Sequence, residues 1–226
     1  MKKFLLMMAL CLMALGAQAQ SKKFCGTITF RDGHEETYTE LYVPARNTDK
    51  LLVRPDGGKI KKIPSEDIHM VTVWSAKFPD MKSTIFCLQM EDNREKFVIW
   101  GVPFMSSKWG VVFRCYDNYT INPKTGELTL LVLLDESLAK LAKPGLQTWQ
   151  PLVLQRFDKE IAETVAFIRS YKKLKNKVRE DVYEYMWPKN TPKQGAKAFE
   201  ENEEIHQQIL DGTLTAADLQ YIIDQM

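Results

Sequence analysis

Three histidines, His34, His69 and His206, are the first residues to examine for chemistry, because imidazole binds metals and titrates near neutral pH. A zinc site needs a second ligand at a fixed spacing, such as a histidine four residues away on a helix. None of the three has such a neighbour, and the spacing of the cysteines is not a metal signature either. The sequence therefore predicts no metal, no cofactor and no catalytic residue from this set.

Cysteine and serine nucleophiles are the next possibility, because a positioned base can activate either side chain. The chain contains no G-x-S-x-G elbow, and Ser106-Ser107 follows Met105 in a segment that lacks flanking glycines. Cys115 and His69 are the residues to test for a hidden catalytic set. A hydrolase with a cryptic site is accordingly the weaker alternative function.

Aromatic side chains offer a different chemistry, since exposed rings stack on sugars and on peptide side chains. Most of the tryptophans fall in apolar strand patterns, where a core position is the more common outcome. Tyr38 and Tyr42 share a predicted strand face with Glu40 and are expected to be exposed. We predict that these two tyrosines form a small contact surface.

The first residues predict an export signal. Lys2 and Lys3 precede an apolar run from Phe4 to Leu15, which is too short to span a bilayer as a helix. The small residues at 17–19 suit signal peptidase, so residues 1–19 are the predicted signal peptide. We expect a periplasmic or secreted protein that is not transmembrane once the signal is removed.

The predicted mature chain is electrically balanced. The full sequence has 31 basic residues, two of which lie in the signal, against 29 acidic residues outside it. Nucleic-acid binding needs a basic field, so a nucleic-acid partner is not expected.

Three of the four cysteines remain after signal removal: Cys25, Cys87 and Cys115. Export permits a disulfide, and Cys87 with Cys115 is the candidate pair because both lie in apolar strand patterns. The alternative is that all three are small buried or half-buried side chains.

The chain is organised around a compact β unit from Phe24 to Trp74. The pairs Asp32-Gly33 and Asp56-Gly57 separate apolar runs, which is a strong hairpin signal because glycine reaches positive φ readily. A one-turn helical step at 64–67 precedes the last of five short strands. This order is that of a small SH3-like or Sm-like barrel.

A four-stranded meander is predicted from Ser83 to Leu134, with the apolar run after Thr129 as a central strand. Together with the first unit it makes residues 20–147 an antiparallel β region, which ends in a short helix at 137–143.

Residues 148–226 are predicted to be a helical region. Apolar residues from Leu154 to Tyr185 recur at spacings of three and four, which favours a long amphipathic helix or two shorter ones. Thr191-Pro192 begins a further helix, and Thr215 with Asp218 caps the last one. Strands first and helices after predict an α+β fold.

The signal ending AQAQ and the pattern G-x-I-x-F-x-D-G followed by G-K-I-x-K-I-P-x-x-D-I resemble small exported proteins of unknown function that are common in Bacteroidetes. The residues that carry the pattern are Gly26, Ile28, Phe30, Asp32, Gly33, Gly58, Lys59, Ile60, Lys62, Ile63, Pro64, Asp67 and Ile68. The resemblance implies a location in the cell envelope and brings no catalytic residue with it.

The function expected from the sequence is therefore an exported, non-catalytic interaction protein of the cell envelope. Its partner would be an envelope protein, or a second copy bound through the helical region. The alternative is a module that binds a glycan or a peptide through exposed aromatic residues of the β region.

Overall fold

The computed structural model describes most of the chain outside the predicted signal peptide. The residues that the structure describes are 24–92, 94–116, 118–122, 124–131, 148–175 and 178–226. The predicted signal peptide at 1–19 and the short helix predicted at 137–143 lie outside these ranges.

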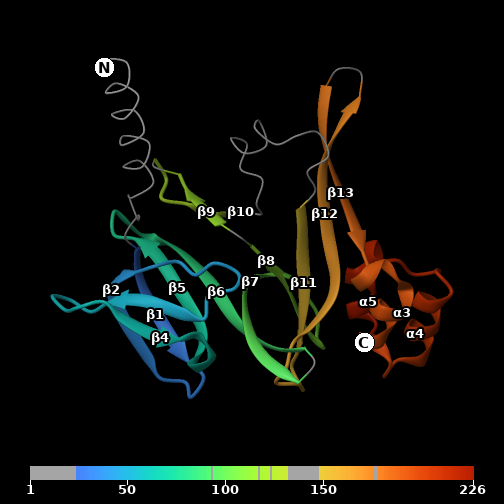
Figure 1. Ribbon diagram of the computed structural model, residues 1–226, viewed down its shortest axis with the longest axis horizontal. Helices are drawn as coiled ribbons and strands as arrows, with labels where there is room; N and C mark the ends of the chain where they lie inside the picture. The colour runs from blue at the N-terminus through green and yellow to red at the C-terminus, as the bar shows by residue number, and fades with distance from the viewer. Residues whose placement is uncertain (1–23, 93, 117, 123, 132–147, 176–177) are drawn as a thin grey trace, which may run out of the picture.

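One antiparallel sheet runs through the described chain (Figure 1). Its spatial order is β13-β12-β11-β8-β7-β6-β5-β1-β2-β3-β4. The strand bounds are β1 Phe24–Phe30, β2 Glu35–Leu41, β3 Lys50–Arg54, β4 Lys61–Pro64, β5 Ile68–Ser75, β6 Phe78–Asp92, β7 Glu95–Ser106, β8 Gly110–Cys115, β11 Thr148–Arg156, β12 Glu163–Lys175 and β13 Val178–Met186.

Short helices follow the last strand and pack beside β12 and β13 (Figure 1). A 3-10 turn, η1 Ser65–Asp67, lies earlier, between β4 and β5. The later helices are η2 Pro188–Asn190, α3 Pro192–Ala196, η3 Lys197–Phe199, α4 Glu203–Leu210, η4 Ala216–Asp218 and α5 Leu219–Asp224.

The first β unit has the predicted strands but not the predicted barrel. Gly33 and Gly57 both have positive φ at the two hairpin turns, and η1 falls where a helical step was expected. However, β5 pairs with β6 on the side away from β1, so the unit continues into the long sheet. The sheet is open, and the SH3-like or Sm-like barrel prediction is wrong.

The predicted meander is correct for three of its four strands. Strands β6, β7 and β8 pair in sequence order. The fourth run is not a central strand, because β10 (Leu128–Leu131) pairs with β9 (Asn118–Ile121) in a separate two-stranded sheet. Half-buried Leu128 packs against the N-terminal core, which accounts for its apolar character.

The helix predicted from Leu154 to Tyr185 is wrong, because this segment forms β11, β12 and β13. Among the described residues of the predicted helical region, helices are found only from Pro188 onward, so β structure continues well past residue 148. Consecutive residues Leu152, Val153 and Leu154 are all buried, so both faces of β11 are covered. Such a strand loses its alternating pattern, and period alone then cannot separate it from a buried helix.

Three apolar clusters hold the described structure together. One, the N-terminal core, joins the N-terminal unit to residues of β6 and β7 and to Tyr116, and a second lies between β11, β12 and the helices. The third is smaller and lies on the opposite face of β8 and β11, where Phe113 and Val153 meet Leu88 of β6. Alternate residues of β8 and β11 therefore belong to different clusters.

Candidate functional site

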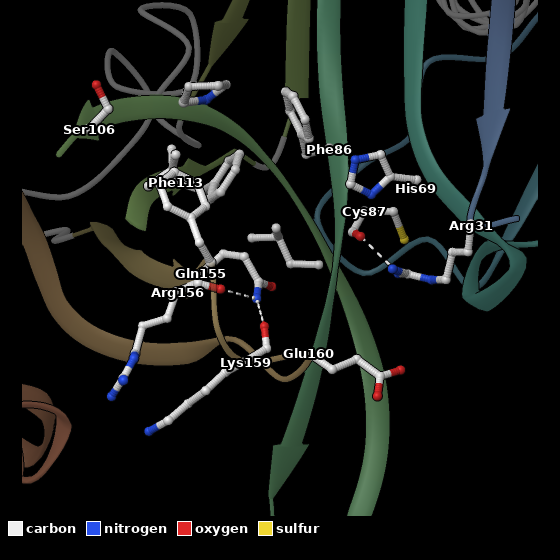
Figure 2. Close-up of a pocket in the computed structure, with 14 residues that line it drawn as sticks. Arg31, His69, Phe86, Cys87, Ser106, Phe113, Gln155, Arg156, Lys159 and Glu160 are labelled. Carbon is white, nitrogen blue, oxygen red and sulfur yellow. Dashed lines mark hydrogen bonds between the residues drawn. The ribbon is translucent and has the colours of Figure 1, made fainter. Parts of the chain in front are cut away.

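A cavity of about 530 Å³ adjoins the third cluster, on the face formed by β6, β7, β8 and β11 (Figure 2). Its apolar wall consists of Phe86, Leu88, Pro103, Val111, Phe113 and Phe157.

The alternation of side chains along each strand and the pairing between strands bring the residues of this wall onto one face of the sheet. Phe86 and Leu88 are two residues apart on β6, as are Val111 and Phe113 on β8, so each pair shares a face. Pro103 of β7 lies directly opposite Phe113. The rings of Phe86 and Phe113 pack against each other in a tilted arrangement, at a centroid distance of 5.1 Å and an interplanar angle of 55°.

The segment after β11 closes one side of the cavity by returning to β6. The backbone N–H of Ala162 donates to the carbonyl oxygen of Gln89 at 2.8 Å, beside a parallel bridge between Met90 and Ala162. Ala162 is buried in the same cluster as Phe113. Because β7, β8 and β11 lie between the bridged segments, this contact requires the sheet to curl around the cavity.

Arg31 lies at the rim with its guanidinium directed to backbone carbonyls. Nη2 donates to the carbonyl oxygen of Cys87 at 2.9 Å (Figure 2), and Nε donates to that of Glu66 at 2.7 Å. With its Nε2 turned to Glu160, the amide of Gln89 donates to that carboxylate at 2.9 Å and accepts from Arg31 at 3.2 Å. The rim cation and the rim anion are thus linked through one amide.

Arg156 anchors the other side of the rim to the helices. Its guanidinium donates to Asp158 and to Glu201, at 2.5 to 2.8 Å, and lies 4.5 Å from the ring centre of Trp109. The hydrogen bonds to Glu201 and Asp158 raise the pKa of Arg156. Lys159 lies 3.6 Å from Glu201 as well. These cations therefore have carboxylate partners already.

The surroundings of His69 favour its neutral form. Burial, and then the positive charge of Arg31, lower the pKa of His69 below its usual 6.5. The ring lies edge-on to Phe86 at 5.8 Å between centroids (Figure 2).

The thiol of Cys87 is not arranged as a nucleophile. Burial raises the pKa of the Cys87 thiol to about 12, and Sγ donates to the carbonyl oxygen of Ser65 at 3.1 Å. A thiol must ionise to attack, so this arrangement opposes catalysis.

Cys25 and Cys87 are free thiols, so the predicted disulfide between Cys87 and Cys115 is not formed. The alternative prediction, small buried or half-buried side chains, is confirmed.

Neither of the two tyrosines predicted to form a contact surface is fully exposed. Tyr38 is 4% exposed and packs in the N-terminal core, with its hydroxyl donating to Glu36. Burial, and then this hydrogen bond to Glu36, raise the pKa of Tyr38. Tyr42 is half-buried and donates to Glu40 at 3.2 Å. The exposure expected for Tyr38 is wrong, because the face that it shares with Glu40 is the inner one.

The histidines are separated in the fold. His34 stacks on Phe30 at 4.0 Å and contacts Asp32 at the first hairpin, whereas His206 donates to the carbonyl oxygen of Ala196. Within the described ranges, no three histidine, cysteine or acidic side chains come together in a way that could hold a metal ion.

Comparison with protein-family models, with curated proteins and with solved structures finds no match for this chain. In the part of the chain that the structure describes, no helix is both long enough and apolar enough to cross a bilayer.

Sequence reasoning missed the cavity and its polar residue Gln155. One signal was present, because Gln155 is a polar residue that directly follows the apolar run from Leu152 to Leu154. The curl that brings Ala162 back to β6 has no comparable local signature.

Proposed function

We propose that this chain is an exported, non-catalytic binding protein of the cell envelope whose central cavity takes an uncharged, mainly apolar ligand. The observation that carries the proposal is the cavity itself. Its volume of about 530 Å³ falls in the range of small-molecule sites, and its wall consists largely of aromatic and aliphatic side chains. Binding would remove this apolar wall from water, which is the main source of affinity in such sites.

The charges at the rim favour an uncharged ligand. Arg31 is committed to carbonyl oxygens and to Gln89, and Arg156 has two carboxylate partners. A charged ligand would lose its hydration on entering the cavity and would have to compete for cations that are already paired. An apolar ligand avoids both costs.

The ionisation state of the cavity residues supports a non-catalytic role. The thiol of Cys87 stays protonated far above neutral pH, and its hydrogen is used by Ser65. A nucleophilic cysteine needs a low pKa, and at Cys87 burial outweighs the opposite effect of the nearby guanidinium of Arg31.

A second candidate ligand is an apolar side chain of a partner protein. Phe157 lies at the cavity rim with 66% of its surface exposed, which is unusual for so large an apolar residue. An exposed aromatic ring beside an apolar pocket is a common feature of peptide-binding surfaces.

The direct test is binding of the uncharged fluorescent probe N-phenyl-1-naphthylamine, whose emission rises in apolar surroundings. Val111 is half-buried and lines the cavity, so the indole of Val111→Trp should protrude into it and weaken probe binding by at least about tenfold. Val102 is half-buried too but packs against the N-terminal core, so Val102→Trp is the matched control and should leave binding unchanged. Equal affinities of the wild-type protein and Val111→Trp would refute the proposal.

A further inference from the structure

The side chain of Gln155 has its amide orientation fixed by two backbone carbonyls. Its Nε2 donates to the carbonyl oxygens of Arg156 and Lys159, at 3.1 and 2.5 Å (Figure 2). Carbonyl oxygens are acceptors, so a half-turn of the amide would place Oε1 against two other acceptors. The amide nitrogen therefore stays on the side of the loop that follows β11.

The amide oxygen of Gln155 consequently turns away from that loop, toward the interior of the cavity (Figure 2). Oε1 accepts no hydrogen bond from the residues that the structure describes. Around it the wall is apolar, with Leu88 and Phe113 among its residues. An acceptor in such surroundings is hydrated when the cavity is empty of ligand, and a ligand that displaces the water must replace its hydrogen bond.

We infer that Gln155 determines the specificity of the cavity, and that the cavity selects ligands with an apolar body and one uncharged O–H or N–H donor. The inference rests on the proposed function and names the ligand class. A ligand without a donor leaves Oε1 desolvated and unpaired, which weakens its binding. A ligand with the donor satisfies Oε1 and covers the apolar wall at the same time.

Charged ligands of the same size are disfavoured by the same geometry. A carboxylate would bring its lone pairs against those of Oε1, and the guanidinium of Arg31 already donates to carbonyl oxygens. An ammonium group could donate to Oε1, but it would lose its hydration on entering the apolar cavity, and the carboxylate of Glu160 that lines the cavity already accepts from Gln89.

Three probes with one ring system test the inference: 2-naphthol carries a donor, 2-methylnaphthalene carries none, and 2-naphthoate is an anion. Their dissociation constants are measured at neutral pH by displacement of N-phenyl-1-naphthylamine from the full mature chain. We expect 2-naphthol to bind about three- to tenfold more tightly than 2-methylnaphthalene, and 2-naphthoate to bind most weakly.

Two variants assign this preference to Gln155. Gln155→Met keeps a side chain of similar length without the acceptor, so both uncharged probes should bind to it with similar affinity. Gln89→Met removes an amide that contacts Glu160 and Arg31 and is the control that should keep the preference. The readout is the ratio of the affinities for 2-naphthol and 2-methylnaphthalene. A variant that merely loosens the loop would weaken the binding of both probes to the same extent and would leave this ratio unchanged.

The outcomes separate the two claims. If neither uncharged probe binds the wild-type protein, the proposed function fails and the inference fails with it. If both bind equally, or if the anion binds best, the cavity is a binding site but the role given to Gln155 is wrong. A preference that survives in Gln155→Met also overturns that role.

Discussion

The two faces of β8 and β11 are both apolar, but the chain covers them to different extents. On one face, Val112 and Leu152 belong to the cluster that the helices complete with Ile209 and Leu219. On the other face, Phe113 lies in the smaller cluster beside the cavity. The same two strands thus support a core that the helices cover, here called the closed face, and a smaller core that adjoins the cavity, here called the open face.

This difference indicates what each face is for. The helices contribute buried residues from Phe199 to Ile223 to the closed face, so the chain has the means to cover an apolar surface fully. An uncovered apolar cavity forfeits dispersion contacts and lowers stability. Leaving one face open is therefore consistent with a binding role, while the closed face is structural.

The largest expected effect comes from the closed face. Ile209 is fully buried, so Ile209→Ala should lower the free energy of unfolding by about 2–5 kcal/mol. Phe157→Ala removes an exposed ring at the rim and should change the free energy of unfolding by no more than about 0.5 kcal/mol. Urea denaturation of both variants measures the contrast, and similar losses for the two would contradict the division into closed and open faces.

Strand glycines allow a test with smaller changes. A Cβ at Gly110 would lie 2.7 Å from the carbonyl oxygen of Gln155, so Gly110→Ala must displace β11 beside the cavity and should cost about 1–3 kcal/mol. At Gly101 the nearest atoms are 3.2 Å away, so Gly101→Ala should cost less. Thermal unfolding ranks the two, and the reverse order would show that the β8–β11 contact is not the tight one.

The smallest effect concerns the ion pairs that join the rim to the helices. Hydrogen bonds from Arg156 lower the pKa of Asp158 and of Glu201 below their ordinary 3.8 and 4.5. The stability that these pairs contribute is therefore present above those pH values and is lost as the pH falls through the lower pKa values of the folded state.

Arg156→Met should accordingly lower the melting temperature at neutral pH, and the difference from wild type should narrow in acid. Lys193→Met, at an exposed position of α3, is the control and should show no such pH dependence. Melting temperatures recorded from neutral pH down to about pH 2 give the comparison. A difference that stays constant with pH would show that the two carboxylates add nothing through Arg156.

Local signals predicted the local structure well. The pairs Asp32-Gly33 and Asp56-Gly57 mark two real turns because positive φ is a property of the residues themselves. The capping box of Thr215 and Asp218 is also formed, since both partners lie within one helical turn.

The features that the sequence did not predict depended on contacts between residues that are far apart in the chain. Burial on both faces hid the strand character of Leu152 to Leu154, and pairing between β8 and β11 joins residues far apart in the chain. The cavity depends further on the curl of the sheet, which includes register shifts beside Pro103 and Leu152 and the bridge at Ala162. The alternation of apolar and polar residues along a strand indicates which face of the sheet a side chain is on, but it does not indicate how the sheet curves.

The most direct test of a binding cavity on one face of these strands is methyl NMR during titration with N-phenyl-1-naphthylamine. The methyl groups of Leu88 and Val111 line the cavity, whereas those of Val112 and Leu152 lie on the closed face. We predict saturable shifts for the first pair and small, non-saturating ones for the second. Shifts confined to the closed face, or none at Leu88 and Val111, would contradict the account.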